Sequence, residues 1–123
     1  MFEITVEHTF AASHAIRLPD GSLEPLHGHN WQLTVTLQRD GLDAIETVFD
    51  FHALEHIVEQ IAQPFHNRHL NDLPPFDTGS ISPTAERVAW WVGTQVGQRL
   101  PDEVTLQCVR VSEAPRCWAA WRP

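Results

Sequence analysis

The feature that most constrains the fold is a regular alternation of apolar and polar residues directly after a His-Gly-His sequence. From Asn30 to Leu37, tryptophan, leucine and valine alternate with glutamine and threonine, which predicts a half-buried β-strand. Side chains on a strand repeat every two residues, so His27 and His29 share the face of Trp31. The pattern therefore predicts two neighbouring imidazoles at the inward-facing start of a strand.

Two imidazoles at this spacing can bind one ion without distorting the backbone, because two strand residues rise roughly 6.5 Å. Imidazole is a common zinc ligand, and a catalytic zinc site combines three protein ligands with an open position. The alternative is two unpaired histidines at the end of a strand. The spacing of His27 and His29 leaves both interpretations open.

Composition restricts the chemistry of this chain of 123 residues. A net charge of −8 argues against nucleic acid or an anionic membrane as the main partner. Lysine and tyrosine are absent, so histidines and carboxylates must carry any proton transfer. Cys108 and Cys117 form no CxxC pair, and the first residues do not form a signal segment, so we expect a cytoplasmic protein. No apolar run approaches membrane length.

The remaining patterns predict one α+β domain over residues 1–123, in the order strand, strand, helix, helix, strand, strand. The first strand covers about nine residues from Phe2, and the last two are expected at 104–112 and 118–121. The expected helices run from an Asp50 cap to Pro64 and from Ser82-Pro83 to Gly97. A domain this short buries only about two-thirds of its unfolded surface, so self-association is expected.

Six short blocks occur in the order and approximate spacing of one known family. They are Phe10-Ala11-Ala12-Ser13-His14, Leu26-His27-Gly28-His29-Asn30, Val48-Phe49-Asp50-Phe51, Leu70-Asn71, Ser82-Pro83-Thr84-Ala85-Glu86 and Val111-Ser112-Glu113. Over nearly its whole length the chain resembles the 6-pyruvoyl-tetrahydropterin synthase and 6-carboxytetrahydropterin synthase family. The resemblance implies a tunnelling fold (T-fold), with an antiparallel four-stranded sheet and two helices. It also implies a homotrimeric or homohexameric barrel with sites at subunit interfaces.

The resemblance also implies roles for individual residues. The zinc ligands fall on His14, His27 and His29, which leave one coordination position for substrate. Glu113 would bind the guanidine-like edge of a pterin, assisted by Thr84. Without the resemblance, Glu113 is a surface charge at a strand end and Thr84 an ordinary first-turn residue.

The chain departs from the family where most members have a catalytic cysteine. Residues 21–26 contain none, and Glu24 is the only titratable side chain there. The sequence Glu24-Pro25-Leu26-His27-Gly28-His29 resembles a family variant in which glutamate replaces the cysteine and the product is 6-hydroxymethyl-dihydropterin, a folate precursor. A carboxylate is an adequate base for hydroxyl groups acidified by zinc. The alternative for Glu24 is a solvated loop acid.

A second departure concerns the aspartate and histidine that the family has before its Leu-Asn block. Ungapped alignment on Leu70-Asn71 places His66 and Asn67 there. Asparagine is neither an acid nor a base at neutral pH. His66 or His69 is therefore the expected proton relay, because imidazole titrates near neutrality.

The leading functional hypothesis is a zinc-dependent lyase acting on 7,8-dihydroneopterin triphosphate, with Glu24 as the base of a retro-aldol cleavage to 6-hydroxymethyl-7,8-dihydropterin. Arginines of neighbouring subunits are expected to bind the phosphates. One alternative is the 6-carboxytetrahydropterin synthase of queuosine biosynthesis, which the missing cysteine disfavours. Another is a zinc- or pterin-binding homologue without catalysis, which His66-Asn67 suggests.

Overall fold

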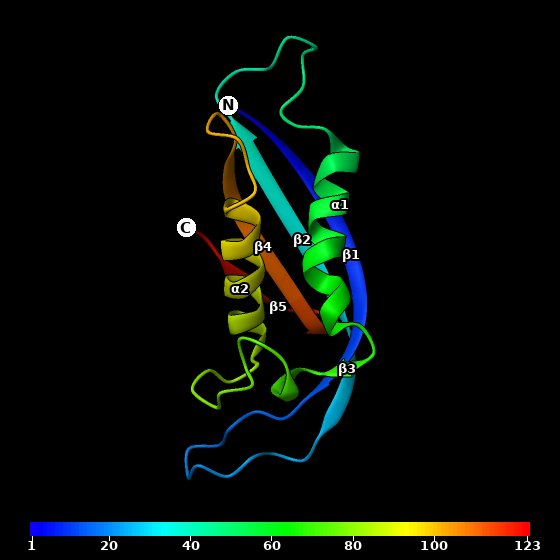
Figure 1. Ribbon diagram of the computed structural model, residues 1–123, viewed down its shortest axis with the longest axis vertical. Coiled ribbons are helices and arrows are strands. Elements are labelled where there is room, and N and C mark those ends of the chain that lie inside the picture. Colours follow the sequence, from blue (N-terminus) through cyan, green and yellow to red (C-terminus); the bar gives the residue numbers. More distant parts are fainter.

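The computed structural model describes residues 1–123 and has two layers, with two helices packed on one face of a β-sheet (Figure 1). The elements are β1 (Phe2–His14), β2 (His27–Arg39), α1 (Phe51–Ala62), β3 (Arg68–His69), α2 (Ala85–Gly97), β4 (Thr105–Ala114) and β5 (Cys117–Trp121), with 3-10 turns at Gln63–Phe65 and Leu70–Asp72. The sheet order is β3-β1-β2-β4-β5. The predicted α+β class is therefore confirmed. None of the helices combines the length and the apolar character needed to cross a membrane.

Strands β1 and β2 form a long antiparallel pair whose register places the site. Phe2 lies opposite Arg39 at one end, and His14 lies opposite His27 at the other. Residues 15–26 connect the two strands beyond this second end (Figure 1). The register thus brings together two histidines that are far apart in the sequence.

The predicted inward face of β2 forms the centre of the core. Trp31 and Leu33 are completely buried, as are the apolar residues that follow at every second position. The indole of Trp31 stacks on Phe10 of β1, with ring centroids 5.9 Å apart. Both helices pack on this face, which contributes most of the folding free energy through apolar burial. The burial pattern confirms that His27 and His29 share the parity of core residues.

Three details differ from the sequence-based expectation. Strand β1 has 13 residues instead of about nine, because its pairing with β2 continues through Ala11 to His14. The prediction that the second helix starts at Ser82-Pro83 is wrong: the Thr84 hydroxyl accepts a hydrogen bond from the Arg87 N–H and so caps a helix that begins later.

The third difference is a fifth strand. Strand β3 has two residues and pairs in parallel with β1 at Ala12 and Ser13. It lies between the two expected helices, where the sequence predicts no strand. Two residues are too few for any hydrophobic periodicity, so this strand has no sequence signature.

Gly93 of α2 allows β5 to pack against this helix. A Cβ at this position would overlap the indole of Trp121 and approach Cδ2 of Leu106 to 3.3 Å. We expect Gly93→Ala to lower the free energy of unfolding by about 1–3 kcal/mol, because overpacking outweighs the gain in helix propensity. Gly97→Ala is the matched control, since a Cβ there meets nothing within 4 Å. Equal denaturation midpoints for the two variants would contradict this assignment.

Candidate metal centre and active site

Three histidines meet at the end of the sheet where β1 stops and β2 starts. His14 is the last residue of β1, and His27 and His29 begin β2. Their candidate ligand atoms all lie within 4.8 Å of one another. His14 is completely buried, and Trp31 lies beneath it with ring centroids 4.9 Å apart. Of all the predicted site residues, these three form the tightest group.

The backbone determines which nitrogen of two of these imidazoles is free. Nδ1 of His14 lies 2.8 Å from the carbonyl oxygen of Pro83, and Nδ1 of His27 lies 3.0 Å from that of Pro25. A carbonyl only accepts, so each Nδ1 carries the proton and each Nε2 carries a lone pair. The two Nε2 atoms are 3.0 Å apart. Facing lone pairs repel each other, and a shared cation removes this repulsion.

The third imidazole also fits a metal ion. Nε2 of His29 is buried and has no hydrogen-bond partner, and the same holds for Oε2 of Glu113. Burial lowers the pKa of His29 below its ordinary value, which favours the neutral imidazole that a metal needs. Three neutral nitrogen ligands are the donor set of a catalytic zinc site. The residues therefore fit zinc.

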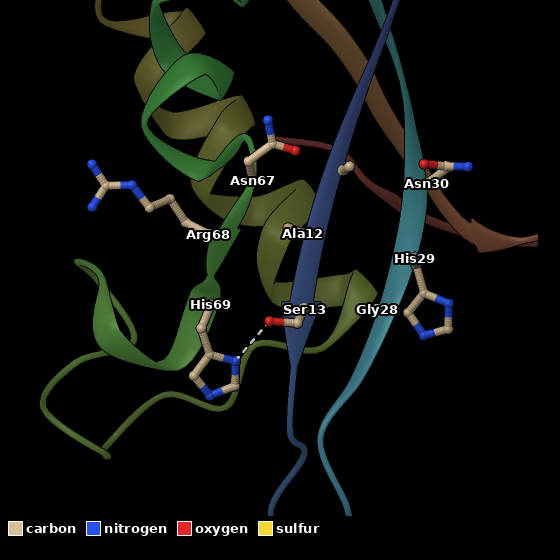
Figure 2. Close-up of a pocket in the computed structure, with 9 residues that line it drawn as sticks. Ala12, Ser13, Gly28, His29, Asn30, Asn67, Arg68 and His69 are labelled. Carbon is tan, nitrogen blue, oxygen red and sulfur yellow. Dashed lines mark hydrogen bonds between the residues drawn. The ribbon is translucent and has the colours of Figure 1, made fainter.

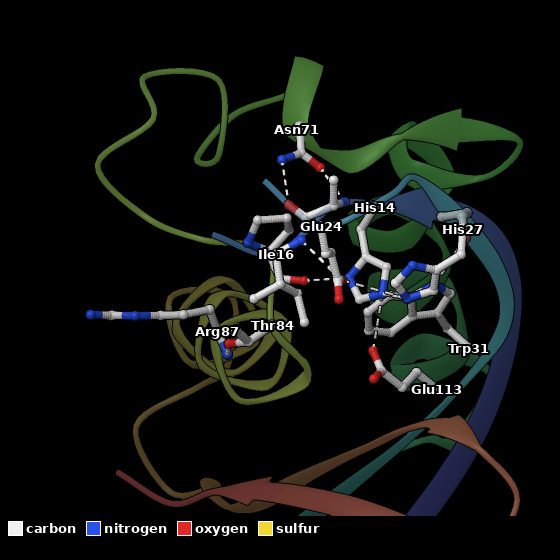
Figure 3. A network of polar contacts seen from close by, with 12 residues as sticks. His14, Ile16, Glu24, His27, Trp31, Asn71, Thr84, Arg87 and Glu113 are labelled. Carbon is white, nitrogen blue, oxygen red and sulfur yellow. Dashed lines mark hydrogen bonds and ion pairs between the residues drawn. The ribbon is translucent and has the colours of Figure 1, made fainter. Parts of the chain in front are cut away.

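Two carboxylates flank the histidine cluster. Oε2 of Glu113 in β4 lies 3.3 Å from Nε2 of His14, and Oε1 of Glu24 lies 3.7 Å from Nε2 of His27 (Figure 3). Oε1 of Glu24 also accepts a hydrogen bond from the Ile16 N–H at 3.0 Å. Both glutamates singled out in the sequence thus lie beside the histidine cluster, and Glu24 is held by the backbone rather than free in solvent.

The other predicted site residues are less closely associated with the histidines. Thr84 caps α2, so the ordinary first-turn role of its side chain is confirmed. His66 is exposed, and its Nδ1 accepts a hydrogen bond from the Ala11 N–H at the open edge of β1. Asn67 adopts a left-handed conformation with φ of 58° and forms the turn into β3.

His69 is half-buried, unlike His66. Its Nδ1 is 3.1 Å from the Ser13 hydroxyl, and the two residues line a pocket of about 480 Å³ that also includes His29 (Figure 2). This pocket contains no carboxylate. Side chains alternate along a strand, so the Ser13 hydroxyl and the His69 ring bound to it lie on the face of β1 opposite to His14.

Sequence reasoning missed the groups that orient these side chains. The carbonyl oxygens of Pro25 and Pro83 orient two imidazoles, and the Asn71 side chain binds the backbone of Ala15. A backbone carbonyl has no side-chain signature, so no pattern was available to find the first two. Asn71 lies in one of the six blocks, but its partner is distant in the sequence.

Known proteins resemble this chain in sequence and in fold. The chain is 28% identical to the dihydroneopterin monophosphate aldolase of Pyrococcus furiosus over 99 residues, which cover 80% of this chain and 78% of the relative. Its fold is similar to that of the Caenorhabditis elegans 6-pyruvoyl tetrahydropterin synthase, with a TM-score of 0.76, 20% identity and coverage of 100% and 97%.

The fold is also similar to that of a Plasmodium vivax 6-pyruvoyltetrahydropterin synthase in which a catalytic glutamate is replaced by alanine. The TM-score is 0.79 at 18% identity, with coverage of 99% of this chain and 97% of the other. These structures confirm the predicted tunnelling fold. The sequence pattern of the family described as 6-pyruvoyl tetrahydropterin synthase matches residues 3–123. The chain therefore belongs to the 6-pyruvoyl tetrahydropterin synthase family.

Proposed function

We propose that this protein is a zinc-dependent lyase that cleaves the side chain of a phosphorylated 7,8-dihydroneopterin to give 6-hydroxymethyl-7,8-dihydropterin. The position of Glu24 carries the proposal, because its carboxylate lies 3.7 Å from the free ring nitrogen of His27. Family membership supports enzymatic chemistry on a pterin. The Pyrococcus furiosus relative is an aldolase of dihydroneopterin monophosphate, which supports cleavage of a carbon–carbon bond.

Glu24 acts as the base in this proposal. Zinc held by the three histidines would supply acidification of the substrate hydroxyl groups. Glu24 takes the proton from the hydroxyl on the second side-chain carbon. The electrons of that O–H bond form the carbonyl of the leaving aldehyde, and the bond between the first and second carbons breaks. The electron pair left on the first carbon is delocalised into the dihydropterin ring, and this carbon then accepts a proton.

Glu113 is the proposed anchor of the pterin ring. Its Oε2 is buried without a hydrogen-bond partner, although the side chain as a whole is 27% exposed. A buried carboxylate without a partner is stabilised most by a ligand that donates two parallel N–H hydrogen bonds, as the pterin edge does. Thr84 would assist from the start of α2 while it also caps that helix.

His66 and His69 are the proposed groups for returning the proton. The ring of His69 is oriented by the Ser13 hydroxyl (Figure 2). His66 lies at the edge of β1 and faces solvent. In an assembly of several copies, this edge would approach a neighbouring subunit.

The proposed assembly is a homotrimer or homohexamer. Strand β1 has a strand partner on its outer side only at Ala12 and Ser13, with Ala11 bound by His66 and Asn67, and β5 is the opposite edge of the sheet. Unpaired edges of this kind favour pairing between copies. Cys108 and Cys117 are both free thiols, which supports the proposed location in a reducing cytoplasm.

Product analysis tests the proposed reaction directly. The purified, zinc-loaded protein is incubated with 7,8-dihydroneopterin triphosphate and, separately, with the monophosphate, and the products are identified by mass spectrometry. We expect 6-hydroxymethyl-7,8-dihydropterin from at least one of them, and the faster substrate identifies the phosphate chain that the site accepts. A 6-carboxy product would contradict the proposal and assign the protein to the queuosine branch. Unchanged substrate with zinc bound would indicate a binding protein.

A further inference from the structure

The chain segment directly after β1 is held by groups from distant parts of the sequence. Pairing between β1 and β2 ends with His14 opposite His27, so the backbone of Ala15 has no strand partner. Ala15 is nevertheless 95% buried, with only 5% of its surface exposed. A buried backbone N–H and C=O both need partners. The side-chain amide of Asn71 supplies both.

The Asn71 side chain takes the place of a neighbouring strand. Its Oδ1 accepts from the Ala15 N–H at 2.9 Å, and its Nδ2 donates to the Ala15 carbonyl at 2.8 Å (Figure 3). Asn71 is itself fixed by the 3-10 turn Leu70–Asp72, whose first residue, Leu70, is completely buried. An amide is the side-chain group that offers an acceptor and donors in one plane, as a peptide group does.

Ala15 lies between two functional positions. It follows His14, whose imidazole is oriented by the Pro83 carbonyl, and it precedes Ile16, whose N–H binds the Glu24 carboxylate at 3.0 Å. The backbone at 14–16 therefore carries a metal ligand on one side and the donor that orients the proposed base on the other. Any rotation about Ala15 moves both groups.

We propose that Asn71 is a positioning residue that sets the geometry of the metal ligand His14 and of Glu24 through the backbone of Ala15. Asn71 touches neither the metal ligands nor the carboxylate, so it acts only through this segment. Loss of a group that orients a metal ligand typically lowers metal affinity or activity about 10- to 100-fold. The part that concerns Glu24 rests on the proposed function, whereas the part that concerns His14 does not.

Zinc affinity and the cobalt spectrum test the proposal in the full-length protein. Zinc dissociation constants are measured by competition with a chromophoric chelator, and the visible spectrum of the Co²⁺ form reports ligand geometry. We expect Asn71→Ala to weaken zinc binding about 10- to 100-fold and to change the cobalt bands. We also expect kcat to fall, because the Ile16 N–H that orients Glu24 belongs to this segment.

Asp43→Ala is the control for a purely structural effect. Asp43 lies in the loop at the opposite end of β2. It accepts from the backbone N–H groups of Ile45 and Thr47 at 3.0 and 2.9 Å and from the Thr47 hydroxyl at 2.7 Å. The substitution Asp43→Ala therefore removes three hydrogen bonds, one more than Asn71→Ala removes, and we expect unchanged zinc affinity. Asn71→Asp is a second variant, because it keeps the acceptor for the Ala15 N–H but puts a second acceptor in place of the donor, where it repels the Ala15 carbonyl oxygen.

Three outcomes decide the matter. Weakened zinc binding and altered cobalt bands in both Asn71 variants, with neither in Asp43→Ala, support the proposal. The proposal is overturned if Asn71→Asp has the zinc affinity and cobalt bands of the unmodified protein. It is also overturned if Asn71→Ala and Asp43→Ala lose zinc affinity to the same extent. If the unmodified protein itself binds no zinc, the proposed function fails as well, and this result is separate from a failure that concerns Asn71 alone.

Discussion

Replacement of Glu24 by glutamine is expected to lower kcat about 10²- to 10⁴-fold, which is the usual loss when a general base is removed. Glutamine has the same shape, and its Oε1 can still accept from the Ile16 N–H, so the loop should keep its conformation. The zinc content should also stay the same, because the proposed metal ligands are the three histidines. Steady-state kinetics together with metal analysis of the same sample measure both quantities.

Glu59→Gln is the matched control for this substitution. Glu59 is an exposed residue of α1, so the same chemical change should leave kcat unaffected. Glu24→Gln is therefore expected to change kcat and not zinc content. If Glu24→Gln retained full activity with zinc bound, Glu24 would not be the base.

Replacement of His29 by alanine is expected to have the largest effect on metal binding. His29 contributes one of three imidazoles, and its Nε2 is buried without any other partner. Loss of a direct ligand should exceed the effect of losing an orienting group, so we expect zinc affinity to fall by more than about 100-fold. Chelator competition gives the dissociation constant, and circular dichroism of the metal-free protein shows whether the fold is retained.

His52→Ala is the control for the removal of an imidazole. The His52 side chain in α1 is 90% exposed, and its only ion-pair partner is Glu55 at 3.5 Å. Its removal should change neither zinc affinity nor turnover. A result in which His29→Ala bound zinc as tightly as the unmodified protein would place the metal elsewhere.

The elements were predictable where the hydrophobic pattern is long. The alternation in β2 and the apolar stripe behind Asp50 each extend over many residues, so their burial follows from periodicity alone. The start of α2 was misplaced because Ser82-Pro83 and Thr84 are competing start signals, and the hydrogen bond from Arg87 to the Thr84 hydroxyl decides between them. Strand β3 exists only because its two residues lie beside β1.

The candidate site was predictable to a different degree for each residue. His27 and His29 are neighbours on one strand, so local geometry places them together. The positions of His14, Glu24 and Glu113 came from a resemblance between sequence blocks, and the structure places all three beside the pair. The same resemblance gave Thr84 a role at the pterin, whereas its observed contact is the helix cap.

The sequence by itself determined which side chains face the core and that two imidazoles start an inward-facing strand, since both follow from the two-residue repeat of a β-strand. Only the tertiary structure decided which groups orient them. The register of β1 against β2 brings His14 to His27, and carbonyls of Pro25 and Pro83 select the free ring nitrogens. Hydrogen bonds to backbone carbonyls depend on the path of the chain and not on residue type, so they become visible only in the folded molecule.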